Sequence, residues 1–199
     1  MKTKKIKAKR MRVKKLWILT LTVVVLATLF AGCNKQEGSK SEKEEMFVGL
    51  STTDLEGNEV DDSIFAENDL TLINAWATWC SPCVNELPEL SELNQELQKE
   101  GIKVGIKGLV METDKAQLKV GLSDGERENA NYILEKTGAS YQQLLVSEKL
   151  AASPLQEQTG FPTTYFVDKN GKLVGEPISG AKDKDEWRSI IEKKLKEIE

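Results

Sequence analysis

The residues of this 199-residue sequence with the clearest chemistry are two cysteines in the stretch WCSPC. Cys80 and Cys83 lie two residues apart, so their sulfurs can approach and do redox chemistry, hold a metal or close a structural disulfide. A thiol at the start of a helix meets unpaired backbone N–H groups and the positive end of the helix dipole, which favour the thiolate that attacks disulfides. Pro82 suits the first turn of such a helix, where no N–H is required.

The two alternatives to redox chemistry find little support in the composition. Structural zinc takes four protein ligands and catalytic zinc three, yet the chain has no histidine and only three cysteines. Copper delivery would also need ligands that are missing. A structural disulfide across four residues contributes only about 2 kcal/mol in the loop-entropy treatment. We therefore expect no metal and no other cofactor.

The first 32 residues predict export. Residues 1–15 carry nine lysines and arginines and no acid, an apolar run follows over residues 16–30, and Ala31 and Gly32 precede Cys33. This is the layout of a secretory signal peptide. A cysteine after two small residues resembles a bacterial lipobox, although Phe30 stands where lipoboxes usually have leucine. We predict a lipoprotein signal peptide over residues 1–32 and lipidation of Cys33.

An uncleaved helical anchor is the alternative. The apolar run of residues 16–30, with two small residues appended, falls just short of the about 17 to 25 residues that a span needs. In both cases the basic flank stays in the cytoplasm. We therefore expect the rest of the chain at the extracytoplasmic face of a bacterial cell membrane, held there by its lipid anchor.

Removal of the leader leaves an acidic chain. Nine of the 28 basic residues lie in the leader, so 19 basic residues remain against 32 acidic ones, a net charge of −13. This charge argues against binding to nucleic acid.

Residues 33–45 contain no apolar side chain after the cysteine and predict a flexible tether with a typical reach of about 20 Å. Residues 46–199 predict one domain.

Hydrophobic periodicity places the cysteines between a strand and a helix. Residues 69–77 form a nearly continuous apolar run, typical of a strand buried on both faces. From Cys83 to Leu97 apolar residues recur at helical spacing, and Gly101 is a suitable stop. Residues 102–110 alternate as a second strand.

The second half of the domain predicts further helices and strands. Helices are expected at residues 129–137, before Gly138, and at residues 150–159, with a short strand at residues 144–146. Residues 163–175 predict a hairpin, because Asn-Gly supplies the positive φ angles of a tight turn.

The end of the chain predicts a helix with one apolar stripe. Asp183 and Glu186 form a possible capping pair at its start. The stripe consists of Trp187, Ile190, Ile191, Leu195 and Ile198. Strands that alternate with helices in this way predict an α/β fold with a mixed sheet.

The motifs of this chain resemble those of a known family. WCSPC at residues 79–83 directly follows a buried strand, and GFPTT at residues 160–164 opens a later strand before a hairpin and a terminal helix. Both features resemble thioredoxin-fold proteins, and among them the membrane-anchored TlpA/ResA-like thiol-disulfide oxidoreductases. The resemblance covers residues 47–199 and implies a thioredoxin-like fold, with a central mixed β-sheet flanked by helices.

The resemblance also implies roles for residues. Cys80 is expected as the exposed attacking thiol, Cys83 as the buried resolving thiol that pairs with it in a disulfide, and Pro162 as a cis proline beside them. Once Cys80 holds a mixed disulfide with a substrate, Cys83 can displace it. Trp76 is expected in the core. The residues expected along the substrate groove are Trp79, Ser81, Pro82 and Phe161.

Two polar positions bear on proton transfer. Cytosolic thioredoxins usually carry a buried aspartate six residues before the first cysteine; this chain has Asn74 there, so that proton route is missing. TlpA/ResA-like proteins have instead a glutamate three residues after the second cysteine, here Glu86, on the helix face of Cys83. Its carboxylate would raise the pKa of the thiols and serve Cys83 as a general base. The alternative is a solvated helix charge like Glu89. Pro88 is expected to kink or open the helix just beyond.

The resemblance implies a reductase of disulfide-containing exported proteins, supplied with electrons by a membrane donor of the CcdA/DsbD type. A disulfide-forming oxidase of the same fold and a non-enzymatic lipoprotein binding module are the alternatives. Strong oxidants of this fold often have a histidine between the cysteines, and Ser81-Pro82 offers no such charge. Peroxide reduction is disfavoured, because the family's peroxidases place their reactive cysteine in a different motif.

Residues 112–128 predict a surface insertion between a strand and a helix.

Overall fold

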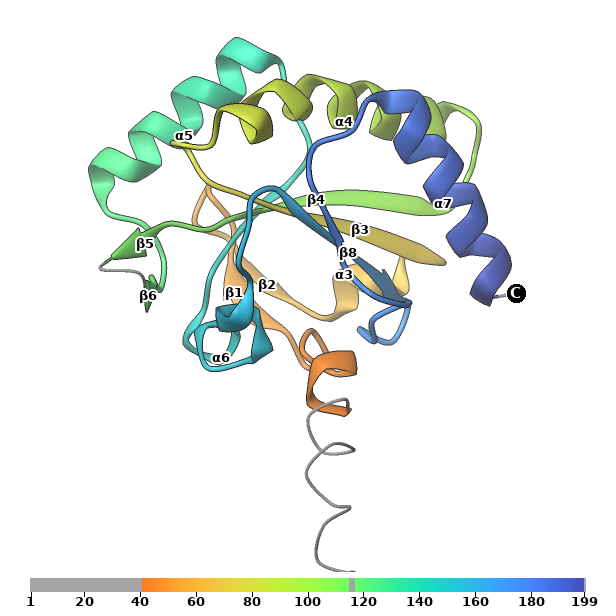
Figure 1. The fold of residues 1–199 in the computed structure, drawn as a ribbon, viewed down its shortest axis with the longest axis horizontal. Coiled ribbons are helices and arrows are strands. Elements are labelled where there is room, and N and C mark those ends of the chain that lie inside the picture. Colours follow the sequence, from red (N-terminus) through yellow and green to blue (C-terminus); the bar gives the residue numbers. More distant parts are fainter. Residues whose placement is uncertain (1–40, 115–116, 199) are drawn as a thin grey trace, which may run out of the picture. The chain divides into compact units, whose positions relative to one another are not determined.

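A five-stranded mixed sheet forms the centre of the fold in a computed structural model that describes residues 41–114 and 117–198 (Figure 1). The strand order is β7-β4-β3-β8-β9. The central strand β3 (Leu70–Trp76) pairs in parallel with β4 (Val104–Val110) and antiparallel with β8 (Thr163–Asp168). The outer strands are β7 (Gln143–Leu145), parallel to β4, and β9 (Ile178–Ser179), antiparallel to β8. The predicted α/β fold with a mixed sheet is confirmed.

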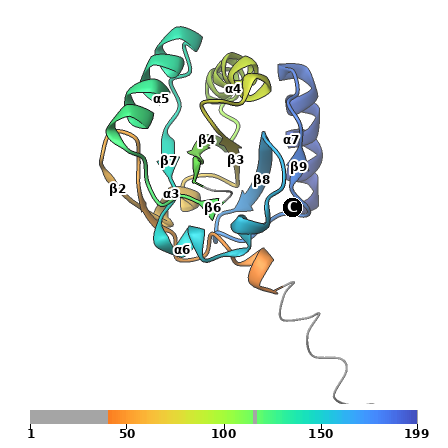
Figure 2. The same ribbon diagram turned by 60° about the vertical axis from the view of Figure 1, so that its left-hand side comes forward.

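Three long helices cover one face of this sheet. They are α4 (Ser81–Lys99), α5 (Asp124–Thr137) and α7 (Lys184–Ile198). Figure 2 shows α4 between α5 and α7, and α4 contacts both neighbours as well as β4. The core under these helices contains every buried apolar residue of α4 from Cys83 to Leu97, together with Trp76, Phe166 and Trp187.

Shorter elements cover the opposite face. They are the hairpin of β1 (Ser51–Thr53) and β2 (Glu59–Asp61), the helices α3 (Ser63–Ala66) and α6 (Glu148–Ala151), and a 3₁₀ turn at Pro154–Glu157. A second apolar core lies among them and includes Phe47, Phe65 and Tyr165. Because both faces of the sheet are covered, all residues of β3 are buried.

Most predicted boundaries near the cysteines are confirmed. The strand before the cysteines ends at Trp76, and α4 begins directly after Cys80 and stops before Gly101, whose φ is 71°. The helix continues through Pro88, which lacks the N–H that would bond to the carbonyl of Val84. The structure therefore shows one helix from Ser81 to Lys99, which Pro88 does not open.

Two helices begin with reciprocal capping. Ser123 and Glu126 form a capping box that starts α5 at Asp124, five residues earlier than the sequence predicts, and Gly138 ends it in the left-handed region. Asp183 and Glu186 cap α7, since the N–H of each donates to the carboxylate of the other, at 3.2 and 2.8 Å. The predicted capping pair of the terminal helix is confirmed.

Two predictions in the second half are wrong in part. The helix expected over residues 150–159 is split into α6 and the 3₁₀ turn, because Pro154 cannot continue a helix and Ser153 caps a new turn. The hairpin turn at Asn170-Gly171 is present, but Leu173 makes only an isolated bridge to Val167. The strand that pairs with β8 is instead β9, a few residues later.

The N-terminal part of the described chain lies against the domain. Met46 and Phe47 are buried, and the Leu173 N–H donates to the Glu44 carbonyl at 2.8 Å. Within residues 41–114 and 117–198, no helix has the length and hydrophobicity to span a membrane. The predicted signal peptide, Cys33 and most of the predicted tether lie outside the described residues.

Candidate active site

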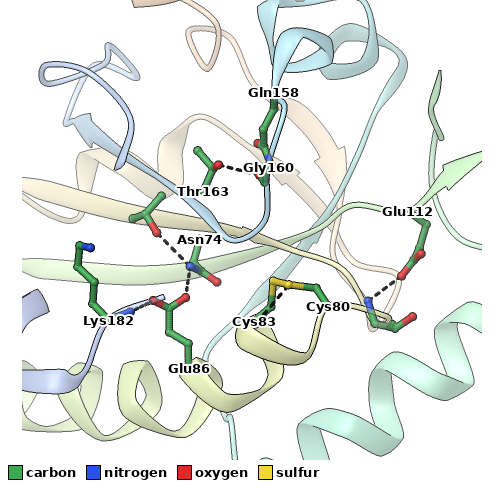
Figure 3. The surroundings of a disulfide bond; sticks show 11 residues. Asn74, Cys80, Cys83, Glu86, Glu112, Gln158, Gly160, Thr163 and Lys182 are labelled. Atoms are coloured by element: carbon green, nitrogen blue, oxygen red, sulfur yellow. Dashed lines mark hydrogen bonds between the residues drawn. A yellow bond between two sulfur atoms is a disulfide. The ribbon is translucent and has the colours of Figure 1, made fainter. Parts of the chain in front are cut away.

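Cys80 and Cys83 form a disulfide at the N-terminus of α4 (Figure 3). The sulfurs are 2.06 Å apart and the Cα atoms 5.3 Å. Cys80 is the N-cap residue, and its sulfur accepts the N–H of Cys83 at 3.3 Å. One N–H group of the helix start, that of Cys83, therefore points at this sulfur and favours a thiolate there once the disulfide is reduced. The predicted pairing is confirmed.

The two sulfurs differ less in exposure than the resemblance implies. In the disulfide state Cys80 is only 5 % exposed and Cys83 is fully buried. The expectation of an exposed Cys80 is wrong for this state, since little of the residue is accessible to solvent. Cys80 is nevertheless the more exposed of the two cysteines, as the resemblance implies.

An aromatic pair, the exposed Trp79 and the half-buried Phe161, lies next to Cys80. Trp79 is 59 % exposed and meets the ring of Phe161 edge-on, with 5.4 Å between ring centroids. Ser81 and Pro82 are also exposed. The predicted groove residues therefore present an accessible, partly apolar surface beside Cys80, whereas Trp76 is buried as expected.

The loop that carries Phe161 is held by side chains. The Phe161–Pro162 peptide bond is cis, as the resemblance implies. The Gly160 carbonyl accepts from Thr163 Oγ1 and from Gln158 Nε2, both at 2.9 Å (Figure 3). Tyr165 in turn donates its hydroxyl to Gln158 Oε1 at 2.8 Å. Gln158 was not predicted as a site residue, since a lone glutamine in a loop gives no sequence signal.

Glu86 is buried below the disulfide, so the alternative of a solvated helix charge is wrong. It is 2 % exposed and its carboxylate accepts three N–H groups. Oε1 accepts from the Lys182 backbone and from Trp187 Nε1, each at 2.8 Å, and Oε2 accepts from Asn74 at 2.9 Å. Burial raises the pKa of the Glu86 carboxyl above its usual value, against the lowering effect of these hydrogen bonds.

Asn74 links Glu86 to the central strands. Its Nδ2 donates to Glu86 and also to Thr164 Oγ1, at 3.0 Å (Figure 3). Its Oδ1 is buried and has no hydrogen-bond partner among the described residues. The position where cytosolic thioredoxins have an aspartate is therefore part of the same polar cluster as Glu86, which the sequence did not indicate.

Glu112 is a second buried carboxylate near the cysteines. The prediction of a surface insertion over residues 112–128 is wrong at its start, because Glu112 is only 5 % exposed and its Oε1 accepts the Thr78 N–H at 2.9 Å. Thr78 lies in the loop between β3 and α4 that leads to Cys80. The segment continues as a hairpin of β5 (Thr113–Asp114) and β6 (Gln117–Leu118) and then as α5. No sequence signal marked Glu112, because its partner is 34 residues away.

The arrangement can carry out thiol exchange with proton transfer. It has a helix-capping sulfur, a second sulfur behind it and a buried carboxylate one helical turn further along α4. In the part of the chain that the structure describes, no three histidine, cysteine, aspartate or glutamate side chains gather to hold a metal ion.

Comparisons with known proteins agree with this geometry. The AhpC/TSA family matches residues 44–175. Thiol-disulfide oxidoreductase ResA of Bacillus cereus is 26% identical over 182 residues, which cover 88% of this chain and 95% of the relative. ResA of Geobacillus thermodenitrificans is 28% identical over 191 residues, covering 90% and 97%.

A solved structure shows the same fold. The thiol:disulfide interchange protein of the thioredoxin family from Chlorobium tepidum TLS superposes with a TM-score of 0.56 at 18% identity, covering 74% of this chain and 94% of the other. The predicted thioredoxin-like fold is confirmed.

Proposed function

We propose that this chain, which belongs to the AhpC/TSA family, is a ResA-like thiol-disulfide oxidoreductase. In this proposal it reduces disulfides of exported proteins through Cys80 and Cys83. The observation that carries the proposal is the Cys80–Cys83 disulfide at the start of α4, next to the exposed ring of Trp79. Relatives named thiol-disulfide oxidoreductase ResA match the chain over most of its length.

The reaction follows from the placement of the sulfurs. The Cys80 thiolate of the reduced protein attacks a substrate disulfide, so that one substrate sulfur leaves as a thiolate and the other is joined to Cys80. Cys83 then loses its proton and attacks the Cys80 sulfur, which forms the Cys80–Cys83 disulfide and releases the second substrate thiolate. Two electrons pass from the protein to the substrate, and the protein ends in the state that the structure shows.

Glu86 is the proposed acceptor of the Cys83 proton. It follows Cys83 by three residues on α4 and is buried on the same side of the helix. The raised pKa of its carboxyl makes it a better base than an exposed glutamate. A base is needed because Cys83 is fully buried and has no access to solvent of its own.

The proposed direction is reduction. Ser81 and Pro82, between the cysteines, carry no charge that would stabilise a reduced thiolate. After each turnover the disulfide must be reduced again, and a membrane electron donor of the CcdA/DsbD type is the proposed source. A disulfide-forming oxidase of the same fold would run the same steps in reverse.

The proposed location is the outer face of the cell membrane, through a lipid on Cys33. The support is the sequence of residues 1–33, with its basic, apolar and small-residue segments. Cys33→Ala should remain an unprocessed precursor without fatty acid, and fatty-acid label on that variant would contradict the proposal.

The exchange role can be tested by trapping partners. Cys83→Ala lacks the thiol that releases the mixed disulfide, and external thiols replace it slowly because their concentration is low. Expressed in its own cell envelope, Cys83→Ala should therefore accumulate protein adducts through Cys80, which reduction separates and mass spectrometry identifies. Trapped exported proteins would be substrates, and a trapped multispan membrane protein would be the electron donor.

The matched variant is Cys80→Ala, which retains only the buried thiol and should trap far less. Equal trapping by both variants would contradict the assigned roles. Trapping by neither, together with failure of the wild-type protein to reduce insulin, would favour a binding module with a structural disulfide.

A further inference from the structure

The position of Phe161 depends on the loop that leads into β8. Phe161 is half-buried, and its ring meets that of Trp79 with 5.4 Å between the ring centroids. Trp79 is the exposed neighbour of Cys80. The residues on either side of Phe161 are Gly160 and Pro162, so whatever holds these two residues decides where the aromatic pair stands next to Cys80.

The C-terminal side of this loop is held by the sheet. The Pro162 carbonyl accepts the N–H of Gly180, the residue directly after β9, at 2.9 Å. The next residue, Thr163, is already part of β8 and pairs with Ser179. Backbone pairing therefore fixes Pro162 without help from a side chain.

The N-terminal side of the loop is held by side chains instead. Gly160 lies outside the strands, and apart from its chain neighbours nothing lies within 4 Å of the position that a Cβ would take there. Glycine also has the widest choice of backbone conformations. The Gly160 carbonyl accepts from Gln158 Nε2 and Thr163 Oγ1, both at 2.9 Å (Figure 3). These two donors, which occupy both lone pairs of the oxygen, fix this end of the loop.

Of the two donors, Gln158 is the one with a fixed orientation. The Thr163 hydroxyl lies 3.5 Å from Ser179 Oγ and can turn to that partner. Gln158 Oε1 accepts the Tyr165 hydroxyl at 2.8 Å, and the Tyr165 side chain is buried on β8. Burial raises the pKa of this hydroxyl, so it stays protonated and remains a donor. Because the amide must donate toward Gly160, its oxygen necessarily faces Tyr165.

We propose that Gln158 is a positioning residue for substrate binding, whose amide bridges β8 and the loop and so holds Phe161 against Trp79. The inference rests on the proposed thiol-disulfide exchange at Cys80. Gln158 takes no part in the exchange itself and acts only through the loop. Its loss should therefore weaken the binding of a protein substrate and leave the chemistry of the sulfurs unchanged.

The surface that Gln158 completes favours a class of substrate. The residues predicted along the groove are Trp79, Ser81, Pro82 and Phe161, and none of them is charged. Aromatic rings supply a large apolar contact area. The substrate that fits is an exported protein with an apolar residue next to the disulfide that Cys80 attacks.

NMR spectroscopy of the oxidised full-length protein tests the positioning without any substrate. Nuclear Overhauser contacts between the rings of Trp79 and Phe161 should be present in wild type and weakened in Gln158→Ala, which removes both hydrogen bonds of the amide. The matched control is Gln156→Ala, at an exposed glutamine two residues earlier, and it should keep the contacts. Contacts of equal strength in wild type and a folded Gln158→Ala protein would overturn the inference.

A second variant separates the two bonds of the amide. Gln158→Glu keeps the length of the side chain and the acceptor for Tyr165, but it presents an acceptor to the Gly160 carbonyl in place of the donor. Its ring contacts should be weakened as in Gln158→Ala. Wild-type contacts in Gln158→Glu would show that the bond to Gly160 does not hold the loop.

Kinetics test the consequence for substrates. In Gln158→Ala the KM for insulin should rise about tenfold, the upper end of what one hydrogen bond contributes, with kcat unchanged. The rate with hydroxyethyl disulfide should also be unchanged, because this small disulfide has no chain to lie on the rings. An unchanged KM for insulin would contradict the inference, and so would an equal loss of rate with both disulfides.

Two disulfide peptides that differ only in the residue before the reactive cysteine test the substrate class. Wild type should reduce the peptide with leucine about fivefold faster than the peptide with serine, the effect of partly burying one leucine. In Gln158→Ala this ratio should fall toward one, and an equal ratio in both proteins would contradict the inference. Failure of the wild-type protein to reduce insulin would instead count against the proposed function, since the NMR comparison needs no substrate.

Discussion

At the scale of single residues, the site depends on polar groups that are buried and partnered. Glu86 is a carboxylate at the base of the site, held by three N–H donors. These bonds reduce the cost of burying its charge but do not cancel it, since burial still raises the pKa of the carboxyl. A group of this kind binds a proton more tightly in the folded protein than in the unfolded chain.

Glu86→Gln should therefore change how stability depends on pH. Because the pKa of Glu86 is higher in the folded protein than the ordinary value of 4.5, wild type should lose stability as pH rises from that value through the folded pKa. Above the folded pKa the loss is complete. Glu86→Gln cannot ionise and should lack this loss, which urea unfolding between about pH 4 and pH 8 would measure.

The control for this prediction is Glu128→Gln, a change of an exposed carboxylate on α5. It should reproduce the wild-type profile. A Glu86→Gln profile parallel to that of wild type would mean that the Glu86 pKa is not raised.

At the scale of elements, the site depends on how β3 and β4 end next to each other. The two strands pair in parallel from Leu70 and Val104 to Trp76 and Val110, so the segments that follow them leave the same edge of the sheet. The loop after β3 leads to Cys80, and the residue two positions beyond β4 is Glu112. The Glu112 carboxylate holds that loop through the Thr78 N–H.

Glu112→Ala should loosen the loop before Cys80. It leaves the Thr78 N–H without its acceptor, which should lower the free energy of unfolding by about 1–3 kcal/mol. It should also change the rate at which reduced Cys80 reacts with a thiol reagent, because the sulfur is no longer held at the helix start. Glu112→Gln keeps an acceptor oxygen and should behave more like wild type in both measurements.

Asp54→Ala is a control that also removes a buried carboxylate acceptor of backbone N–H groups, but at a site away from the cysteines. Asp54 is also buried and accepts backbone N–H groups, those of Glu56 and Asn58, in the turn between β1 and β2. It should reduce stability without changing the reactivity of Cys80. If both alanine variants changed that reactivity equally, the effect would be general destabilisation rather than positioning by Glu112.

At the scale of the whole molecule, the domain has an apolar core on each side of the sheet. The active-site helix packs on one core, while Phe47 lies in the other and contacts Phe65 and Tyr165 edge-on, with ring centroids 6.4 and 5.7 Å apart. Phe47 stands only two residues after the predicted tether. The start of the domain is therefore part of its core.

Phe47→Ala should destabilise the domain by about 3–5 kcal/mol, since it removes a fully buried aromatic side chain. Disulfide exchange per folded molecule should be unchanged, because Phe47 belongs to the core on the other side of the sheet from α4. Denaturant unfolding and insulin reduction measure the two quantities. Tyr132→Ala, at an exposed aromatic residue of α5, should change stability by less than about 0.5 kcal/mol, and an equally small change in Phe47→Ala would contradict its place in the core.

The sequence by itself determined the features that depend on neighbours within a few residues. WCSPC after an apolar run is enough to place Cys80 at a helix start, because strand and helix periods change at that point. Asn170-Gly171 determined a turn, and Asp183 with Glu186 a helix cap. The helical period also put Glu86 on the face of Cys83.

Only the tertiary structure decided what surrounds those residues. The partners of Glu86 come from positions 12, 96 and 101 residues away, and Glu112 reaches back 34 residues to Thr78. Such contacts follow from the order of the strands and the packing of α7 beside α4, which periodicity along the chain does not encode. The same glutamate would be a solvated charge on an isolated helix, and it becomes a buried carboxylate with a raised pKa because distant segments exclude water and supply its three donors.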